Sequence, residues 1–481
     1  MRVSPAGSTI VTDLPPTGTL QKGPVAAATA VETHRHYDST SGHPAVPASA
    51  PLRVFPMILI ALSLRLIVAS FLLSDHLNPA RDNWKFGWET GRLARSLASG
   101  HGFSCPLFGD TGPSAWMAPL YPFLLAGVFK LFGIYSVASA AFAVSFNCVV
   151  AALTCIPIVR ACEISFSRTA ARAAGWFWVF FPYSIYLAGG RIWSNSLAAF
   201  FMALLLWQTV RLSRESPNRA WLAYGLTWGL AALTEPSILA VLPCLLAWLF
   251  WRARGHRTFR LGRSAMAMAV FLAVIAPWMA RNSIVFHHFV PFRDNFWLVL
   301  WQSNTGDTSD LYPDWANPPH NDGEMAEMQR VGEFAYMQEK RTLALANLRA
   351  HPLLHSWITL RRIGFFWTGF WSLSPAYSRN EPFQIPNALM SLCLTLGMLA
   401  GMRSAWRSNL PSAAPFLLSL VFFPLLFYAT HPGIEYRHPI DPLVVCFLGV
   451  AVSETFIPRR LASVTTRVAA TRFPTGAIDE A

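Results

Sequence analysis

The sequence has 481 residues, of which 53% are hydrophobic and 13% are charged. Soluble globular proteins contain about 25% charged residues, so this composition excludes an ordinary soluble enzyme and indicates a chain that resides in a lipid bilayer. The formal net charge of +13 does not indicate a nucleic-acid-binding protein, because the basic residues are mostly Arg in short clusters between apolar runs. Among the seven cysteines, only Cys105 lies clearly away from those runs and their edges, which argues against a disulfide framework and redox chemistry.

The N-terminal segment differs in composition from the rest of the chain. Residues 1–52 are rich in Pro, Ala, Ser and Thr and contain no apolar core, so we expect a disordered cytoplasmic tail rather than a cleaved signal peptide. Residues 53–457 form the predicted transmembrane domain, whose first apolar segment acts as an uncleaved anchor. Residues 458–481 form a second cytoplasmic tail.

A membrane-spanning helix needs about 20 mostly apolar residues, and about ten segments approach this requirement. The sequence therefore predicts an all-α polytopic membrane protein. The expected spans are 53–74, 136–159, 172–190, 192–210, 220–235, 236–252, 264–283, 385–402, 412–430 and 438–456.

Basic residues in short loops are retained on the cytoplasmic side of a membrane. Arginine clusters follow every second predicted span, so five loops agree on one orientation. The clusters are Arg160/Arg168/Arg172, Arg211/Arg214/Arg219, Arg252/Arg254/Arg257/Arg260/Arg263, Arg403/Arg407 and Arg459/Arg460. Both termini are then cytoplasmic, and two large loops, 75–135 and 284–384, lie on the outer side.

Each outer loop contains an apolar stretch that we do not expect to cross the membrane. A crossing at 117–133 would invert every later loop, and 353–372 carries two arginines in its middle and an aromatic-rich end. Both are predicted to lie at the membrane interface. A helix over 323–348 is expected to cover a cavity at the membrane face.

The first outer loop contains the candidate catalytic acids. The pattern from Trp88 predicts an amphipathic helix that ends at Gly100, with Glu89 in its first turn. A carboxylate held there can act as general base on an acceptor hydroxyl or amine. Alternatively, Glu89 interacts favourably with the helix N-terminus alone, and Asp82, the second candidate, is a solvated loop residue.

Other candidate residues are predicted at the outer ends of the helices. Arg281, Arg293 and Arg437 could bind a lipid phosphate, because a guanidinium donates two parallel hydrogen bonds to phosphate oxygens. Alternatively, these arginines anchor the helices at the interface. Arg65 lies inside the first span and is expected to face the protein interior, where Glu235 could pair with it.

Five further residues could line a pocket for the sugar or its acceptor, although structural hydrogen bonding is the alternative for each. They are Trp193, Asn195, Glu235, His438 and Asp441. The histidines show neither HxxxH nor HExxH spacing, so we predict no metal site and no cofactor.

Three passages resemble bacterial members of glycosyltransferase family 39 and their relatives, which have the C-type glycosyltransferase fold. The resemblance spans about residues 55–456. The passages are Ala118-Pro119-Leu120-Tyr121-Pro122-Phe123-Leu124-Leu125-Ala126 with Phe132-Gly133; Ala276-Pro277-Trp278-Met279-Ala280-Arg281-Asn282 with Val290-Pro291-Phe292-Arg293-Asp294-Asn295 and Trp301-Gln302-Ser303-Asn304; and Glu435-Tyr436-Arg437-His438-Pro439-Ile440-Asp441-Pro442.

The resemblance implies a C-type bundle of about ten transmembrane helices, with interfacial helices in the two large outer loops. It also implies a polyprenyl-phosphate-linked sugar as donor, inverting transfer on the periplasmic face of a bacterial cytoplasmic membrane, and an acid of the first outer loop as base. The sequence departs from the family pattern here, because the usual Asp falls on Phe86. Glu89 and Asp82 are the nearby acids.

The expected function is therefore transfer of a sugar to a lipid, polysaccharide or protein acceptor. A transporter or flippase for a lipid or small solute is the alternative, and it predicts charged residues at mid-depth of several helices. A third class, an enzyme that joins polysaccharide to lipid, shares the large outer loops.

Overall fold

The computed structural model describes residues 51–77, 85–213, 217–252, 257–305, 317–372 and 383–456. The chain divides into two units, Met1–Pro51 and Leu52–Ala481, and every helix described below belongs to the second. Asp82 and almost all of the two predicted tails lie outside the described residues.

All the regular elements in the described ranges are helical, which confirms the predicted all-α class. They are α1 (Phe55–Leu72), η1 (Leu73–His76), α2 (Trp88–Ala98), α3 (Leu120–Phe132), α4 (Val137–Leu153), α5 (Cys155–Ser165), α6 (Arg168–Val179), α7 (Pro182–Gly190), α8 (Asn195–Leu212), α9 (Asn218–Thr234), η3 (Pro236–Val241), α10 (Leu242–Arg252), α11 (Arg257–Phe286), α12 (Phe296–Gln302), η5 (Pro318–His320), α13 (Asp322–Val331), α14 (Glu333–Ala350), α15 (Pro352–Thr368), α17 (Gln384–Phe422), α18 (Leu425–Ala429), α19 (Ile434–Arg437), η6 (His438–Ile440) and α20 (Asp441–Phe456).

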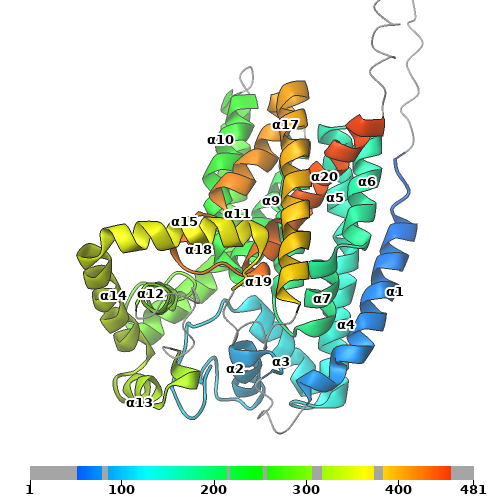
Figure 1. Cartoon of the computed structure of the whole chain (residues 1–481). Helices are drawn as coiled ribbons and strands as arrows, with labels where there is room; N and C mark the ends of the chain where they lie inside the picture. Colours follow the sequence, from blue (N-terminus) through cyan, green and yellow to red (C-terminus); the bar gives the residue numbers. More distant parts are fainter. Residues whose placement is uncertain are drawn as a thin grey trace, which may run out of the picture. The chain divides into compact units, whose positions relative to one another are not determined.

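The bundle and the loop helices have different orientations. Helices α1, α4, α5 and α6 lie roughly along one axis and α20 is oblique to it, whereas α15 runs across it (Figure 1). Residues from both predicted outer loops share a second apolar core, which includes Leu93, Trp116, Trp301 and Tyr336. The two loops therefore pack as one layer against the bundle.

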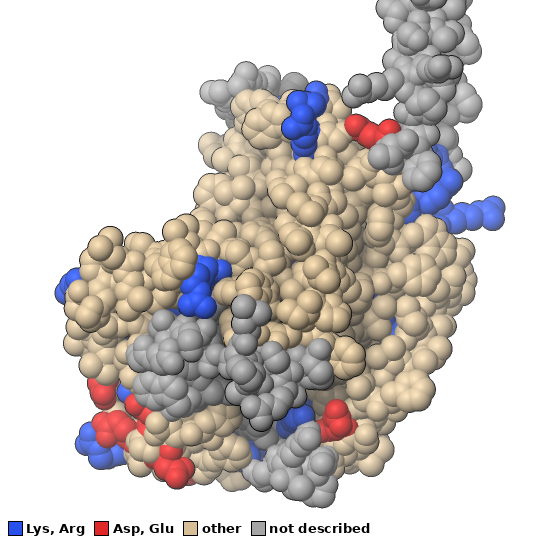
Figure 2. Space-filling model, viewed as in Figure 1, with Lys and Arg blue, Asp and Glu red and all other residues tan. Residues whose placement is uncertain are grey.

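Five helical segments are long and apolar enough to cross a membrane, in the part of the chain that is described. They are Phe55–His76, Val137–Ser165, Asn195–Leu212, Leu261–Phe286 and Gln384–Ala429. Much of the flank between the two ends of the molecule is uncharged in Figure 2, as expected for a surface that contacts lipid. The count of ten spans stays a prediction.

Local breaks interrupt the helices at three places. Pro182 separates α6 from α7, since proline cannot donate the backbone hydrogen bond that would continue α6. Asn409 has non-helical dihedral angles (φ −158°, ψ 75°) and kinks α17 between two expected spans. In the second loop, Gly332 with φ 84° divides the expected helix over 323–348 into α13 and α14.

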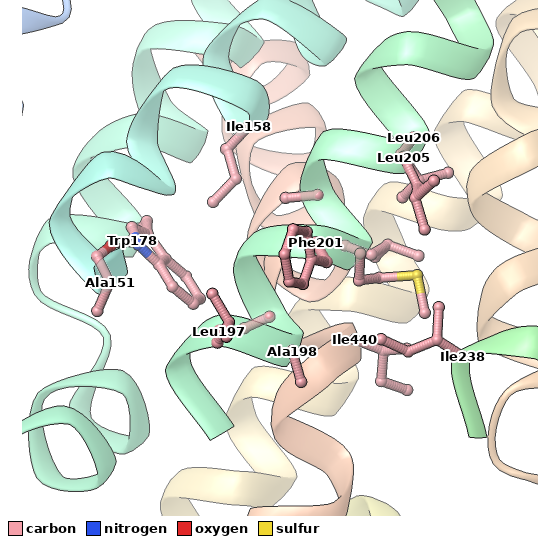
Figure 3. Close-up of a cluster of buried hydrophobic side chains, with 14 of the residues drawn as sticks. Ala151, Ile158, Trp178, Leu197, Ala198, Phe201, Leu205, Leu206, Ile238 and Ile440 are labelled. Carbon is pink, nitrogen blue, oxygen red and sulfur yellow. Dashed lines mark hydrogen bonds between the residues drawn. The ribbon is translucent and has the colours of Figure 1, made fainter. Parts of the chain in front are cut away.

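The bundle is held together by close helix packing around α8. Side chains of α8, including Leu197 and Phe201, contribute to a buried cluster with Trp178 and Ile440 (Figure 3). The indole N–H of Trp178 donates to the Ala151 carbonyl at 2.7 Å. At another contact, a Cβ on Gly401 would lie only 1.9 Å from the Phe447 carbonyl oxygen. Glycine at this position therefore allows α17 and α20 to approach each other closely.

Arg65 faces the interior of the bundle, as predicted, but none of its hydrogen bonds is to Glu235. It is fully buried, and its guanidinium donates to the Ala61, Trp178 and Val179 carbonyl oxygens and to Ser184 Oγ at 2.8–3.2 Å. Arg65 therefore supplies hydrogen-bond donors to the backbone carbonyl groups that lack a partner within the helix at the end of α6.

Arg65→Leu should lower the free energy of unfolding by about 3 kcal/mol, since two buried carbonyl groups at the end of α6 lose their donor. Thermal unfolding of the purified protein in detergent would measure the loss. Arg403→Leu, which changes an exposed arginine of α17, is the control. Equal stability of the two variants would contradict the assigned role of Arg65.

Candidate active site

The first outer loop positions Glu89 through a tight turn. Gly87 has φ 88°, and a Cβ on Gly91 would lie 1.9 Å from the Phe86 carbonyl oxygen, so this turn requires glycine at both positions. Helix α2 begins directly after the turn and ends at Ala98, before Gly100. The sequence predicted both the helix and the place of Glu89 in its first turn.

Phe86 lies at the position where the resemblance led us to expect an acid. It is fully buried and packs edge-on against Phe129 and Tyr135, with ring centroids 5.4 and 5.3 Å away. An ionised carboxylate among these rings would be expensive to bury. The position is therefore part of a local aromatic cluster, and Glu89 is the nearest described acid along the loop.

A cavity of about 300 Å³ lies between the first outer loop, the start of α8, the region of α12 and the segment after α18. Residues far apart in the sequence converge on it. Five of the predicted site residues line it: Glu89, Trp193, Asn195, Glu235 and Arg293.

Acidic and basic side chains alternate around the cavity. Arg191 lies 3.7 Å from Glu435, and Arg293 lies 3.9 Å from Glu235, measured between guanidinium nitrogen and carboxylate oxygen. All four side chains are 21–27% exposed. Arg293 Nε also donates to the Trp116 carbonyl at 3.1 Å, which fixes the arginine to the first loop. Both ion pairs exceed hydrogen-bonding distance, so an anionic ligand could compete for either guanidinium.

Glu89 faces this cavity from the N-terminal turn of α2. The Glu89 side chain is half-buried among protein atoms, and it lines the cavity. Burial raises the pKa of Glu89 above its ordinary value, and the positive charges of Arg293, His320 and Arg92 oppose that rise. A carboxylate with a raised pKa is a stronger base than one in water.

Aromatic side chains and one amide form other parts of the wall. Trp193 packs against Trp88 with ring centroids 5.5 Å apart, and Arg191 lies over the same Trp88 ring. Asn195 is 8% exposed and donates to the Glu435 carbonyl at 3.0 Å, whereas its Oδ1 has no hydrogen-bond partner among the described residues. The aromatic part of this wall offers a stacking surface, which suits the face of a sugar ring.

Among the described residues, the other predicted site residues do not line the cavity; they are Arg281, Arg437, His438 and Asp441. Arg281 donates to the carbonyl oxygens of Ser114 and Phe103 at 2.6 and 2.8 Å, so it holds the first loop against α11. Asp441 accepts from Arg437 Nε at 3.1 Å and contacts His438 Nδ1 at 3.0 Å, and all three side chains are buried. Arg281, Arg437, His438 and Asp441 therefore make structural contacts away from this cavity, and their binding roles stay predictions.

The cavity lining also contains polar residues that were not among the predicted site residues, including Arg191, Glu435, Tyr436 and His431. Burial and the nearby positive charges of Arg362 and Arg293 lower the pKa of His431 to about 3, so its ring is neutral at physiological pH. The Tyr436 ring packs edge-on to it at 4.0 Å. Arg191 and Glu435 each lie two residues before a predicted site residue, Trp193 and Arg437. This closeness in the sequence was the signal that could have identified them as site residues.

No group of three or more His, Cys, Asp or Glu side chains that could hold a metal ion occurs in the described ranges. The lining of the cavity contains carboxylates, guanidiniums and aromatic rings.

Comparison with known proteins identifies the fold. Residues 116–280, about a third of the chain, match the family described as dolichyl-phosphate-mannose-protein mannosyltransferase. The structure resembles the oligosaccharyltransferase AglB from Archaeoglobus fulgidus, solved with an inhibitory peptide and a dolichol-phosphate, with a TM-score of 0.52 at 14% identity over 88% of this chain. The chain has the C-type glycosyltransferase fold.

The family match and the structural similarity confirm the resemblance to C-type glycosyltransferases that the sequence motifs indicated. The chain spans 52% of the AglB chain. A weaker similarity, with a TM-score of 0.37 at 16% identity, covers 88% of this chain and 81% of ArnT from Cupriavidus metallidurans bound to undecaprenyl phosphate. No curated protein sequence matches the chain. The family match covers Trp116, Arg191, Trp193, Asn195 and Glu235, whereas Glu89 and Arg293 lie outside it.

Proposed function

We propose that this C-type glycosyltransferase-fold protein transfers a sugar from a polyprenyl-phosphate-linked donor to an acceptor. The observation that carries the proposal is the convergence of Glu89 with Arg191 and Arg293 on one cavity with aromatic walls. The match to a family described by a dolichyl-phosphate-linked donor supports the same donor class.

The cavity residues fit a single displacement. Glu89 would take a proton from the acceptor hydroxyl or amine as that atom attacks the anomeric carbon of the sugar. The bond between this carbon and the phosphate oxygen breaks, and the electron pair leaves with the polyprenyl phosphate. Arg293 and Arg191 would stabilise the departing phosphate, in place of Arg281 and Arg437, whose guanidiniums lie outside the cavity. One displacement at the anomeric carbon inverts its configuration.

The membrane arrangement belongs to the same proposal. The arginine clusters support a topology with both termini in the cytoplasm and the loops 75–135 and 284–384 on the outer side of a bacterial cytoplasmic membrane. The cavity, built from both loops, would then face the periplasm. The acceptor would be a lipid, a polysaccharide or a protein reached from that side.

A transporter was the alternative, and its strongest support was a charged residue at mid-depth. Arg65 is that residue, and its fully buried guanidinium is bonded to helix carbonyls. It lines no water-filled path, so this observation does not favour transport.

A transfer assay tests the proposal directly. The full chain in lipid nanodiscs would be incubated with polyprenyl-phosphate-linked hexoses or pentoses and with membrane glycolipid, polysaccharide or peptide acceptors. Mass spectrometry should detect a glycosylated acceptor and an equal amount of free polyprenyl phosphate. Solute uptake by sealed vesicles, without any glycosylated product from these donors, would instead support the transporter.

Arg293→Ala should weaken binding of a short-chain polyprenyl phosphate about tenfold or more, because a charge-assisted hydrogen bond contributes about 1.5–3 kcal/mol. Calorimetric titration of the protein in nanodiscs measures this affinity. Arg341→Ala, at an exposed arginine of α14, serves as the control. Unchanged affinity in the Arg293 variant would remove this residue from the phosphate site.

A further inference from the structure

Two buried carboxyl groups lie behind the wall of the cavity. Asp294 precedes α12 and is 8% exposed, whereas Glu333 begins α14 and is 3% exposed. Both bind the same residue of the first loop, since the Ala115 amide donates to Glu333 Oε1 at 2.5 Å and the Asp294 amide donates to the Ala115 carbonyl at 3.2 Å. The pair thus joins three segments that are distant in the sequence.

The other carboxyl oxygens have no donor. Asp294 Oδ1, Asp294 Oδ2 and Glu333 Oε2 are buried without a hydrogen-bond partner among the described residues if both groups are ionised. Two ionised carboxylates can only accept, so neither can satisfy the other. One proton between them converts this arrangement into a hydrogen bond, which matches the interaction between the two side chains.

The charged groups that face the pair are Arg281 from α11 and Arg293 from the segment before α12. Arg281 Nη1 and Nη2 donate to the carbonyls of Ser114 and Phe103, and Arg293 Nε donates to that of Trp116. Ser114 and Ala115 contribute neutral donors to Glu333. Neither arginine forms a direct ion pair with the two acids within 4 Å, so the pair is only partly neutralised by its surroundings.

Electrostatics favours retention of a proton at neutral pH. Burial raises the pKa of Glu333 well above its ordinary value, and the negative charge of Asp294 raises it further. Burial also raises the pKa of Asp294, against the opposing effects of its hydrogen bond with Glu333 and of the two arginines. The pair therefore keeps one proton to a higher pH than an isolated carboxyl group would, and this proton forms the hydrogen bond between the two side chains.

The neighbours of the pair line the cavity. Trp116 and Met117 follow Ala115, and Arg293 and Asn295 flank Asp294, and all four belong to the cavity wall. We infer that one proton shared by Asp294 and Glu333 ties α14 to these two segments and so positions the wall around Arg293. The inference concerns the folded chain itself, and only its effect on transfer rests on the proposed function.

The pH dependence has a definite sign. The folded chain keeps the shared proton to a higher pH than the unfolded chain, whose carboxyls titrate near 4.3. Unfolding therefore releases a proton between that value and the raised pKa, so the free energy of unfolding falls as pH rises across this interval. Loss of the proton leaves two buried negative charges, and the wall should loosen on the alkaline side.

Glu333→Gln tests the inference, because the glutamine amide donates to Asp294 and accepts from Ala115 at every pH. Glu339→Gln, at an exposed acid of the same helix, is the matched control. At neutral pH, the infrared spectrum of the full chain should contain a protonated-carboxyl band that disappears in Glu333→Gln and persists in Glu339→Gln. The alkaline decrease in melting temperature should be smaller in Glu333→Gln than in the wild type.

A wild-type minus Glu333→Gln difference spectrum without such a band would overturn the shared proton. Asp294→Asn provides a second variant if Glu333→Gln does not fold, since its amide can donate to Glu333 and should likewise remove the alkaline decrease. In the transfer assay, Glu333→Gln should retain its rate at alkaline pH where the wild type declines. Absence of transfer in the wild type and in every variant would count against the proposed function. The infrared result would still show whether Asp294 and Glu333 share a proton.

Discussion

Glu89→Gln should lower the rate of sugar transfer by about 10²–10⁴-fold, the range that positioned general bases contribute. Glutamine preserves the size and polarity of the side chain but cannot accept the proton of the acceptor. The expected loss is in kcat, because the variant leaves the phosphate-binding guanidiniums of Arg191 and Arg293 in place. Initial rates with the polyprenyl-phosphate-linked donor, measured at several acceptor concentrations, separate kcat from KM.

Asp110→Asn is the matched control, since it changes an exposed acid of the same outer loop. The pH profile adds a second criterion. Burial raises the pKa of Glu89, and a base must be ionised to act, so the wild-type rate should rise with pH through that raised value. The residual rate of Glu89→Gln should lack this rise. A properly inserted Glu89→Gln protein with the wild-type rate would exclude the residue as base.

Asp441→Ala should lower the free energy of unfolding by about 3–5 kcal/mol, the cost of removing one partner from a buried ion pair. Arg437 and Asp441 are 2% and 0% exposed, and His438 contacts the same carboxylate. The alanine variant would leave a buried guanidinium without its counter-ion. Thermal or denaturant unfolding in detergent measures the change.

Two variants calibrate that result. Glu454→Ala removes an exposed acid from the same helix, α20, and should change stability little. Asp441→Asn keeps an oxygen that can accept from Arg437 Nε, so its loss should be smaller than that of alanine. If all three variants unfolded together, the Arg437–Asp441 pair would have no special role in stability.

Apolar patterning predicted the helical membrane class, but it did not predict where the helices break. The expected span 172–190 is divided at Phe181–Pro182, although the proline was visible in the sequence. Average hydropathy does not detect such a break, because apolar residues continue across it. Gly332 divides the expected helix in the second loop for the same reason: a single residue with positive φ ends a helix whose composition continues unchanged.

The candidate site was predicted in part, because sequence indicates the end of a helix more reliably than the direction of a side chain. Glu89 and Arg293 were expected near the outer helix ends, and both line the cavity. Arg281 was expected there too, but its guanidinium meets loop carbonyls instead. Contacts of this kind join residues more than 160 positions apart, and no local pattern encodes them. The carboxyl pair of Asp294 and Glu333 was missed for the same reason.

The hydrogen bonds of Arg65 have a consequence for synthesis of the chain. Its acceptor Val179 lies 114 residues later in the sequence. At roughly 5–20 residues per second, a ribosome needs on the order of 10 s to add that length. During this delay the first helix carries a cation whose acceptors on the later helices do not yet exist. Membrane insertion of the first helix should therefore require that the insertion machinery or water solvates Arg65 until α6 and α7 have been synthesised.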